Sequence, residues 1–277
     1  MLLKKKSYYI LHPVKRVVAK LASGEREMNA PTFVKASRGG AESLFGQVTS
    51  RLAVAIVSGA LPAGALVPNE DDLRAEISAS RTAYREAIRF LAGKGLIEAR
   101  PRSGTRVAPR SSWHLLDPDV LRWSLSSGAD EGFIRDLFEL RALVEPGCSK
   151  IAALRRTSHH LTRMEEALRG METTPPFTDE AMRYDLAFHD AIFDAAGNAA
   201  IAALKEVVAT TLWWSLRIQR GTRSDESFRI PLSDHRRLYD AIARNDGDRA
   251  EMLSRILVDD ALADTLSAFR LGAVADL

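Results

Sequence analysis

Four polar side chains in the second half of the sequence occupy positions that helical periodicity directs toward a protein interior. Asp185 and His189 are one helical turn apart and share a face with Ile192. His235 and Arg141 fall within the apolar stripes of two other segments. Burying a carboxylate, two imidazoles and a guanidinium costs free energy unless each group is paired. A divalent metal ion such as zinc, held by the carboxylate and both imidazoles and bridged by an anion to the guanidinium, would pair all four groups.

Two other interpretations of these residues remain open at this point. The first is a set of internal hydrogen bonds, with Arg141 paired to Glu145 one turn along the same segment. The second is a metal-dependent hydrolase, in which Asp185, His189 and His235 activate a metal-bound water molecule. No second metal cluster, general base or phosphate-binding glycine loop accompanies them in the sequence, so we do not expect an enzyme.

Length and composition indicate a two-domain protein of the cytoplasm. A chain of 277 residues can bury two cores. No uninterrupted apolar run approaches the roughly 18 residues that span a bilayer, so we expect no membrane partner. The apolar stretch at the N-terminus is short and broken by charges, which is not typical of a secretory signal. The single cysteine, Cys148, excludes an intrachain disulfide and a multi-cysteine zinc site.

Charge is distributed unequally along the chain. Residues 1–110 contain 19 Lys and Arg against 9 Asp and Glu, whereas residues 111–277 contain 20 against 27, for a net charge of +3. The basic N-terminal part favours a polyanionic partner, although much of its charge lies before residue 41 and is also explained by a solvated tail.

The order of helix and strand signals predicts a mainly α protein. We expect three helices between residues 44 and 94, followed by two short strands, 96–99 and 105–108, that form a hairpin. This is the order of a winged helix-turn-helix. Only helical segments follow, and they predict an antiparallel all-α bundle. The predicted organisation is a flexible basic arm (1–40), a winged helix-turn-helix (41–110), a linker with a short helix (111–129) and an all-helical domain (130–272).

The third predicted helix carries a stripe of arginines. Arg81, Arg85 and Arg89 are spaced by four residues and lie apart from the apolar face. Guanidinium groups there can contact guanine edges in double-stranded DNA, while the hydroxyls of Ser80 and Thr82 reach phosphates. An ordinary solvated face, with an arginine paired to Glu86, is the alternative.

The predicted hairpin is also basic. Its turn contains Arg102, Ser103 and Gly104, and Arg106 follows on the second strand. Arginines at such a turn can enter a minor groove or contact the DNA backbone.

Several motifs in this region occur together and in order. They are the segments 59–70, 80–87, 94–97 and 103–107, and together they closely resemble the GntR-type regulators. The resemblance implies Ser80, Arg81, Thr82 and Arg85 as recognition residues, with Gly104 at the tip of the wing. Asp71 stands where some members have arginine, so the resemblance does not imply a phosphate or base contact from that position.

The second half of the chain resembles the FCD ligand-binding domain of the FadR branch of that family. The motifs are Glu139 to Pro146, Asp185 to His189 with Gly197-Asn198, Asp234-His235, and Asp246 with Asp248. Many members bind a divalent metal through one Asp and three His, and carboxylate effectors bind that metal. The third histidine is expected near Leu257 and is missing here, since no histidine follows His235. Three alternatives follow from this departure: three protein ligands completed by water or effector, weaker metal binding, or a vacant site.

The segment from Trp113 to Trp123 is similar to that of galactonate-operon regulators, which implies a sugar-acid effector such as an aldonate. Arg141 and Trp214 are the residues predicted to contact it. The prediction is therefore a homodimeric transcription regulator, a repressor, that binds a two-fold-related DNA operator under effector control. A DNA-binding protein without an effector is the remaining alternative.

Overall fold

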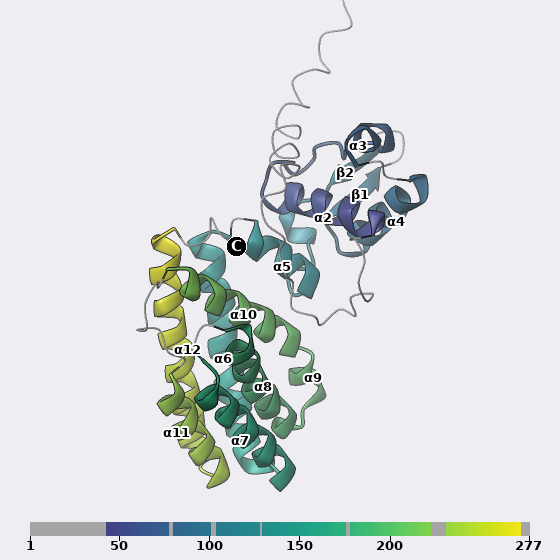
Figure 1. The fold of residues 1–277 in the computed structure, drawn as a ribbon. Coiled ribbons are helices and arrows are strands. Elements are labelled where there is room, and N and C mark those ends of the chain that lie inside the picture. The colour runs from purple at the N-terminus through teal and green to yellow at the C-terminus, as the bar shows by residue number, and fades with distance from the viewer. Residues whose placement is uncertain are drawn as a thin grey trace, which may run out of the picture. The chain divides into compact units, whose positions relative to one another are not determined.

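The computed structural model describes residues 43–77, 80–100, 104–127, 129–175, 178–222 and 231–272. The chain divides into two compact units, residues 1–128 and 129–277. Both are drawn in Figure 1, where colour follows the chain from purple to yellow. The predicted basic arm, residues 1–40, lies outside the described residues.

The first unit contains the predicted helices and hairpin in the predicted order. Its elements are α2 (Leu44–Val57), α3 (Glu70–Ile77), α4 (Arg81–Gly93), β1 (Ile97–Arg100), β2 (Gly104–Val107), η1 (Arg110–Ser112) and α5 (Pro118–Ser126). Helices α2 and α4 pack against each other, and α5 packs on α2. Their core is mainly apolar and includes Val48, Leu91 and Leu96, each 0% exposed. This unit is a winged helix-turn-helix.

Side-chain caps determine where the helices of this unit begin. The Ser43 hydroxyl accepts a hydrogen bond from the Gly46 amide at the start of α2. Asn69 accepts from the Asp72 amide at 3.0 Å, and Asp72 accepts in return from the Asn69 amide at 3.1 Å. These contacts satisfy amide groups that a helix leaves unpaired at its N-terminus. Asn69 therefore caps the start of α3.

Gly95 ends the third helix and begins the hairpin. Its φ is +74°, and a Cβ atom placed on it would lie 2.0 Å from the Ser112 carbonyl oxygen. No residue other than glycine fits both the left-handed backbone and this close approach. The hairpin that follows pairs Ile97 with Val107, one residue away from the predicted strand bounds.

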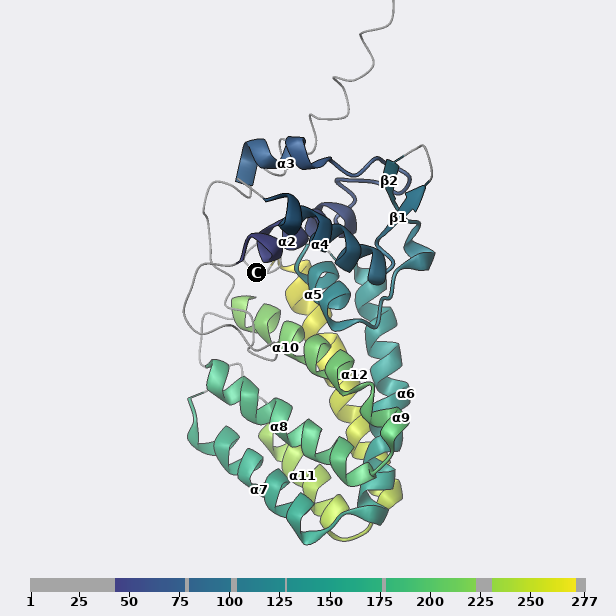
Figure 2. The same ribbon diagram turned by 90° about the vertical axis from the view of Figure 1, so that its right-hand side faces the viewer.

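The second unit is entirely helical in its described residues. Its helices are α6 (Glu131–Arg155), α7 (Ser158–Thr173), α8 (Asp179–Ala196), α9 (Ala199–Ala202), α10 (Lys205–Thr222), α11 (Leu232–Ala243) and α12 (Gly247–Arg270). Helices α6 and α12 lie side by side, as both ribbon views show (Figure 1 and Figure 2). They run antiparallel, because Glu131 at the start of α6 pairs with Arg270 at the end of α12.

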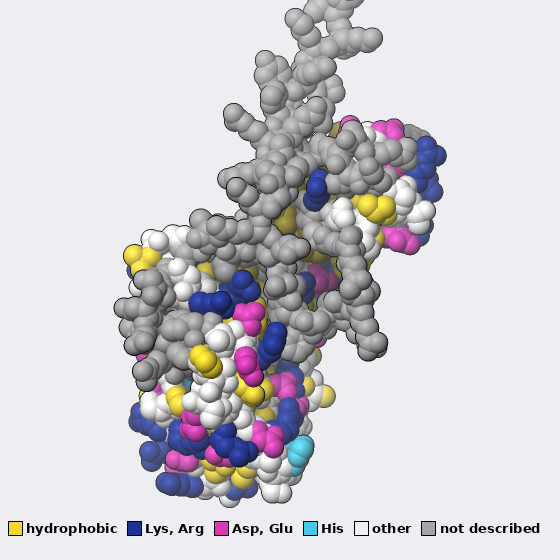
Figure 3. All heavy atoms as spheres, in the orientation of Figure 1, with side chains coloured by type: hydrophobic (Ala, Val, Ile, Leu, Met, Phe, Trp, Pro, Cys, Tyr) yellow, Lys and Arg dark blue, Asp and Glu magenta, His cyan; other side chains and the backbone are white. Residues whose placement is uncertain are grey.

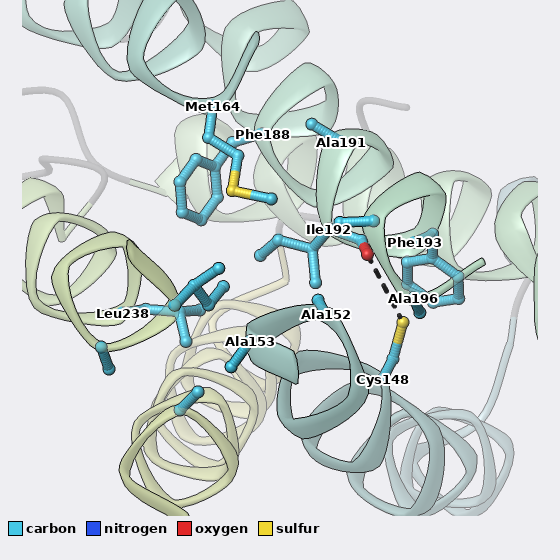
Figure 4. Packing of buried hydrophobic residues seen from close by; sticks show 14 of the residues in the cluster. Cys148, Ala152, Ala153, Met164, Phe188, Ala191, Ile192, Phe193, Ala196 and Leu238 are labelled. Atoms are coloured by element: carbon cyan, nitrogen blue, oxygen red, sulfur yellow. Dashed lines mark hydrogen bonds between the residues drawn. The ribbon is translucent and has the colours of Figure 1, made fainter. Parts of the chain in front are cut away.

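The core of this bundle collects apolar side chains from most of its helices. Figure 4 shows Met164, Phe188, Ile192 and Leu238 meeting between the helices, together with the small side chains of α6. Cys148 lies in the same core with its sulfur 3.9 Å from the Ile192 carbonyl oxygen. Burial, and then the charge of Glu145, raise the pKa of this thiol to about 12, so it is uncharged at neutral pH.

One predicted element differs from the structure. The sequence predicts a single helix over 199–221, whereas the structure has α9 and α10 separated by a turn at Ala203 and Leu204. The Asn198 side chain caps α9, and the Leu204 amide donates to the Ile201 carbonyl at 2.9 Å, which tightens the chain into a turn. The break contains neither glycine nor proline, so sequence periodicity gives no sign of it.

Candidate functional site

The predicted recognition residues lie at the exposed beginning of α4. Ser80 is the N-cap of this helix, and its hydroxyl oxygen accepts from the Ala83 amide at 3.2 Å. The hydroxyl hydrogen of Ser80 is then left for another acceptor. Thr82 and Arg85 are exposed on the first turns of the helix. Figure 3 shows Lys and Arg side chains gathered at the edge of the first unit where α4 lies.

Arg81 is exposed as well, but it already has a partner. Its side chain is 74% exposed, and Nε lies 3.1 Å from Oε1 of Glu70 at the start of α3. The Tyr84 hydroxyl donates to the Pro68 carbonyl at 2.9 Å, which holds α4 against the segment that leads into α3. A pair this exposed contributes about 1 kcal/mol or less, so Glu70 does not prevent Arg81 from contacting an anion.

The wing contributes one described residue of the predicted set. Gly104 begins β2 with a φ of +80° and is exposed. Arg102 and Ser103 lie outside the described residues. Arg106, also considered for a groove contact, instead donates to the Gly64 carbonyl at 2.7 Å and secures the loop beside the hairpin.

In the second unit, the structure brings together the three predicted metal ligands from two helices. Asp185 and His189 lie on α8 and His235 on α11, with one potential ligand atom from each within 4.8 Å of the others. Asp185 and His235 are buried, and the His189 side chain is 12% exposed. Phe188 packs edge-on against both imidazoles, with ring centroids 5.8 and 5.3 Å away. Phe188 therefore packs as an apolar neighbour of both histidines of the cluster.

The contacts of His235 identify which of its nitrogens can bind a metal. Its Nδ1 lies 2.9 Å from the Pro231 carbonyl oxygen, to which it can donate a proton. Its Nε2 lies 2.9 Å from Asp185 Oδ1 but is not aligned for a hydrogen bond, and it has no hydrogen-bond partner within the described chain. Asp185 Oδ2 is likewise buried without such a partner. A nitrogen and a carboxylate oxygen that lack hydrogen bonds in one buried cluster are a donor set suited to a divalent metal.

Arg141 is buried on α6 and is paired with Glu145, one turn along the helix. The Arg141 Nε donates to Glu145 Oε1 at 2.5 Å, and each side chain is 3% exposed. The other Glu145 oxygen, Oε2, lies 3.4 Å from His189 Nδ1. The pair considered in the sequence is thus present, and it reaches the metal-ligand cluster as well. Glu145 was not predicted as a member of this site; its only signal was the four-residue spacing from Arg141.

Electrostatic interactions keep both carboxylates ionised. Burial opposes the charge on Asp185, but His235 outweighs it and the pKa of Asp185 is lowered. Burial also opposes the charge on Glu145, and Arg141 and His189 lower its pKa to about 2. The pKa of His235 is raised, because the attraction of Asp185 exceeds the effect of burial. At neutral pH the cluster therefore has an anionic oxygen ligand in Asp185, and Glu145 beside it is also ionised.

The remaining predicted residue, Trp214, and the position of the missing histidine, Leu257, are both buried in the helical unit. Trp214 is 7% exposed on α10, and Trp213 packs with Met182 and Leu186 in a separate apolar cluster. Leu257, at the position of the expected third histidine, is part of the main core of the bundle. In the described residues, the histidine ligands of the candidate site are the two from α8 and α11.

Comparison with known protein families agrees with this division of the chain. Residues 44–107 match the family described as "Bacterial regulatory proteins, gntR family", and residues 136–260 match the FCD domain. The galactonate operon transcriptional repressor of Escherichia coli is 34% identical over 205 residues, which cover 73% of this chain and 88% of the repressor. The chain belongs to the gntR family.

A second relative of this GntR-family regulator and one solved structure extend the comparison. The regulator LutR of Bacillus subtilis is 30% identical over 217 residues, covering 75% of this chain and 96% of LutR. The structure of Lar, which controls the Listeria monocytogenes agr system, has a TM-score of 0.56 at 18% identity and covers 84% of this chain and all of that one, so the fold is shared.

These matches exclude the enzyme alternative that the sequence left open. Both matched families and the named relatives are transcription regulators, so the chain is a DNA-binding transcription regulator and not an enzyme. The interpretation of Asp185, His189 and His235 as a metal-dependent hydrolase is therefore wrong. Among the described residues, no helix is both long and apolar enough to cross a membrane.

Proposed function

We propose that this regulator is a repressor controlled by a small sugar acid bound at a divalent metal in the helical domain, residues 130–272. The observation that carries the proposal is that two buried atoms, Asp185 Oδ2 and His235 Nε2, lack a hydrogen-bond partner in a cluster with His189. The Escherichia coli relative named for the galactonate operon supports the class of effector and the direction of control.

DNA binding is assigned to the start of α4. Arg85 is exposed there and, with Ser80, Arg81 and Thr82, would contact the major groove and its phosphates. The turn residues Arg102 and Ser103, with Gly104, would contact the adjacent backbone or minor groove.

A second copy of the chain would supply the other half of a two-fold-related operator. Helices α6 and α12 offer a surface for this homodimer. Leu143 and Leu154, eleven residues apart on one face of α6, are 77% and 67% exposed. Met252 and Ile256 on the neighbouring α12 are 53% and 40% exposed. Isolated apolar side chains are common on surfaces, whereas a group on two adjacent helices is typical of an interface.

The metal would be held by Asp185 and by one nitrogen from each histidine. Two nitrogens and a carboxylate oxygen suit zinc and neighbouring transition metals. When bound, the metal supplies a coordination position for a carboxylate or hydroxyl oxygen of the effector. With leucine at position 257, three protein ligands leave room for such an oxygen.

Arg141 would complete recognition of the acid. Its Nη1 is buried without a hydrogen-bond partner, while its Nε is occupied by Glu145. A guanidinium with one free edge can donate to an effector carboxylate at low cost, since most of its charge is already paired. Trp214, which is buried on α10, is proposed to contact the same acid.

The proposal is tested by measuring operator affinity with and without the metal, and with and without the sugar acid. Duplexes selected by the full-length protein from a random DNA library would be titrated by fluorescence anisotropy, with zinc or chelator and with galactonate or gluconate. We expect the acid to weaken DNA binding only when zinc is present, and to have no effect on the Asp185→Asn variant. A DNA affinity that is the same under all these conditions would refute effector control and favour a DNA-binding protein without an effector.

A further inference from the structure

We infer that Glu145 is a positioning residue that orients the metal ligand His189 and connects it to Arg141. The inference rests on the metal site proposed above. Glu145 lies on α6 and His189 on α8, two helices that pack against each other. Its two oxygens have different neighbours: Oε1 accepts from Arg141 Nε, and Oε2 lies 3.4 Å from His189 Nδ1.

The first step concerns the orientation of His189. A metal-binding histidine usually has its second ring nitrogen next to a carboxylate or a carbonyl, which fixes the tautomer and the ring orientation. Glu145 Oε2 provides that carboxylate, just as the Pro231 carbonyl provides the oxygen beside His235 Nδ1. The two imidazoles then present their Nε2 atoms to one ion, and each is supported on its other side.

The second step concerns why a carboxylate is buried at this position. Removing a carboxylate from water costs several kcal/mol, and a single pairing with Arg141 rarely returns more than this cost. Oε2 of Glu145 has no well-aligned hydrogen bond within the described chain, and Arg141 also leaves Nη1 unpaired. A pair that served only stability would not be expected to leave both partners incompletely satisfied in the interior.

The third step is the connection between the effector and the metal. Arg141 Nη1 is unpaired at one end of the series Arg141–Glu145–His189, and the metal position lies at the other. An effector carboxylate that pairs with Arg141 weakens the attraction between Arg141 and Glu145. This changes the electrostatic environment of Glu145 and, through Glu145, that of the metal ligand His189. By this route, acid and metal would influence each other's affinity to the same degree.

The test compares metal binding by the full-length wild type and by Glu145→Gln. Both would be stripped with chelator, and zinc affinity would be measured by competition with a chromophoric chelator. Loss of a carboxylate in this position typically weakens metal binding by about 10–100-fold. Cobalt(II) provides a second readout, because a reoriented imidazole changes its visible absorption spectrum.

Glu131→Gln is a matched control, because Glu131 also pairs with an arginine four residues along α6, at 2.7 Å, but at the far end of the helix from this site. We expect the control to have the zinc affinity and the cobalt spectrum of the wild type. Glu145→Gln should bind zinc more weakly and give a changed cobalt spectrum. If Glu145→Gln melts early without metal, the double variant Arg141→Gln with Glu145→Gln removes both charges and should show the same loss. Wild-type affinity and spectrum in a folded Glu145 variant would overturn the inference alone, whereas a wild type that binds no zinc would overturn the proposed metal site beneath it.

Discussion

The Nε2 atom of His235 lies 2.9 Å from Oδ1 of Asp185 and still has no hydrogen-bond partner. If Nδ1 donates to the Pro231 carbonyl, neutral His235 turns a lone pair toward an ionised oxygen, and the two repel. Only a cation at this position relieves the repulsion, and it can be a proton on Nε2 or a metal ion. A proton would make the two side chains an internal ion pair, whereas a metal ion would bridge them.

Replacement of Arg85 by alanine should weaken operator binding. The side chain is exposed on α4, and a guanidinium that contacts a base edge contributes about 1–3 kcal/mol. Fluorescence anisotropy with the selected duplex would measure the loss. Arg183→Ala, which changes an exposed arginine of α8 in the other unit, should keep wild-type affinity. Equal affinities for the two variants would remove Arg85 from the recognition set.

Substitution of Gly95 by alanine should destabilise the end of α4. The left-handed φ costs about 1–2 kcal/mol for any other residue, and the new Cβ would lie 2.0 Å from the Ser112 carbonyl oxygen. Gly59→Ala is the matched comparison, with a φ of +77° and nothing within 4 Å of an added Cβ. We expect Gly95→Ala to cost about 1–3 kcal/mol more than Gly59→Ala. Hydrogen exchange of the α4 amides would measure it, and similar costs for both would show that the Ser112 contact is unimportant.

Much of this site follows from sequence because helical periodicity determines which face of a helix is buried. The inward positions of Asp185 and His235 were predictable in this way, since each shares a stripe with apolar residues. The alignment of Glu145 with His189 was not predictable, because it depends on the rotation and offset of α6 against α8. The same limit applies to Arg106, whose hydrogen bond to Gly64 depends on a loop 42 residues earlier in the chain.

Low pH should weaken the packing between α7, α8 and α10, because it protonates Asp194. Burial opposes its charge, but Lys205 and Arg163 outweigh this and lower its pKa below the ordinary 3.8. A lowered pKa gives stability that is present above pH 3.8 and is lost as the pH falls through the folded value. Asp194 is partly exposed, so we expect the contribution to be about 1 kcal/mol or less.

Denaturant unfolding of wild type and Asp194→Asn between pH 2 and 7 would test this. The two stability curves should differ at neutral pH and converge in acid. Asp136→Asn, at an exposed position of α6, should follow the wild type. A constant difference between wild type and Asp194→Asn over the whole range would contradict the prediction.

Charged residues on the exposed face of α6 should separate the proposed homodimer. The double variant Leu143→Glu with Leu154→Glu would place like charges on an apolar surface, and we expect a monomer by sedimentation velocity. Operator binding should weaken as well, since one copy can occupy only half of a two-fold site. Leu271→Glu changes a leucine that is 74% exposed just after α12 and should remain dimeric. A double variant that sediments like the wild type would exclude this face as the interface.

The most direct test of the central claim is calorimetric titration of zinc into chelator-stripped protein, compared with Asp185→Asn and His235→Ala. The account predicts one saturable zinc site per chain in the wild type and its loss in both variants. Saturation at 100 times the dissociation constant should also stabilise the wild type by about 2.7 kcal/mol. No saturable binding by the wild type, or wild-type binding by both variants, would contradict the claim that Asp185, His189 and His235 hold a metal ion.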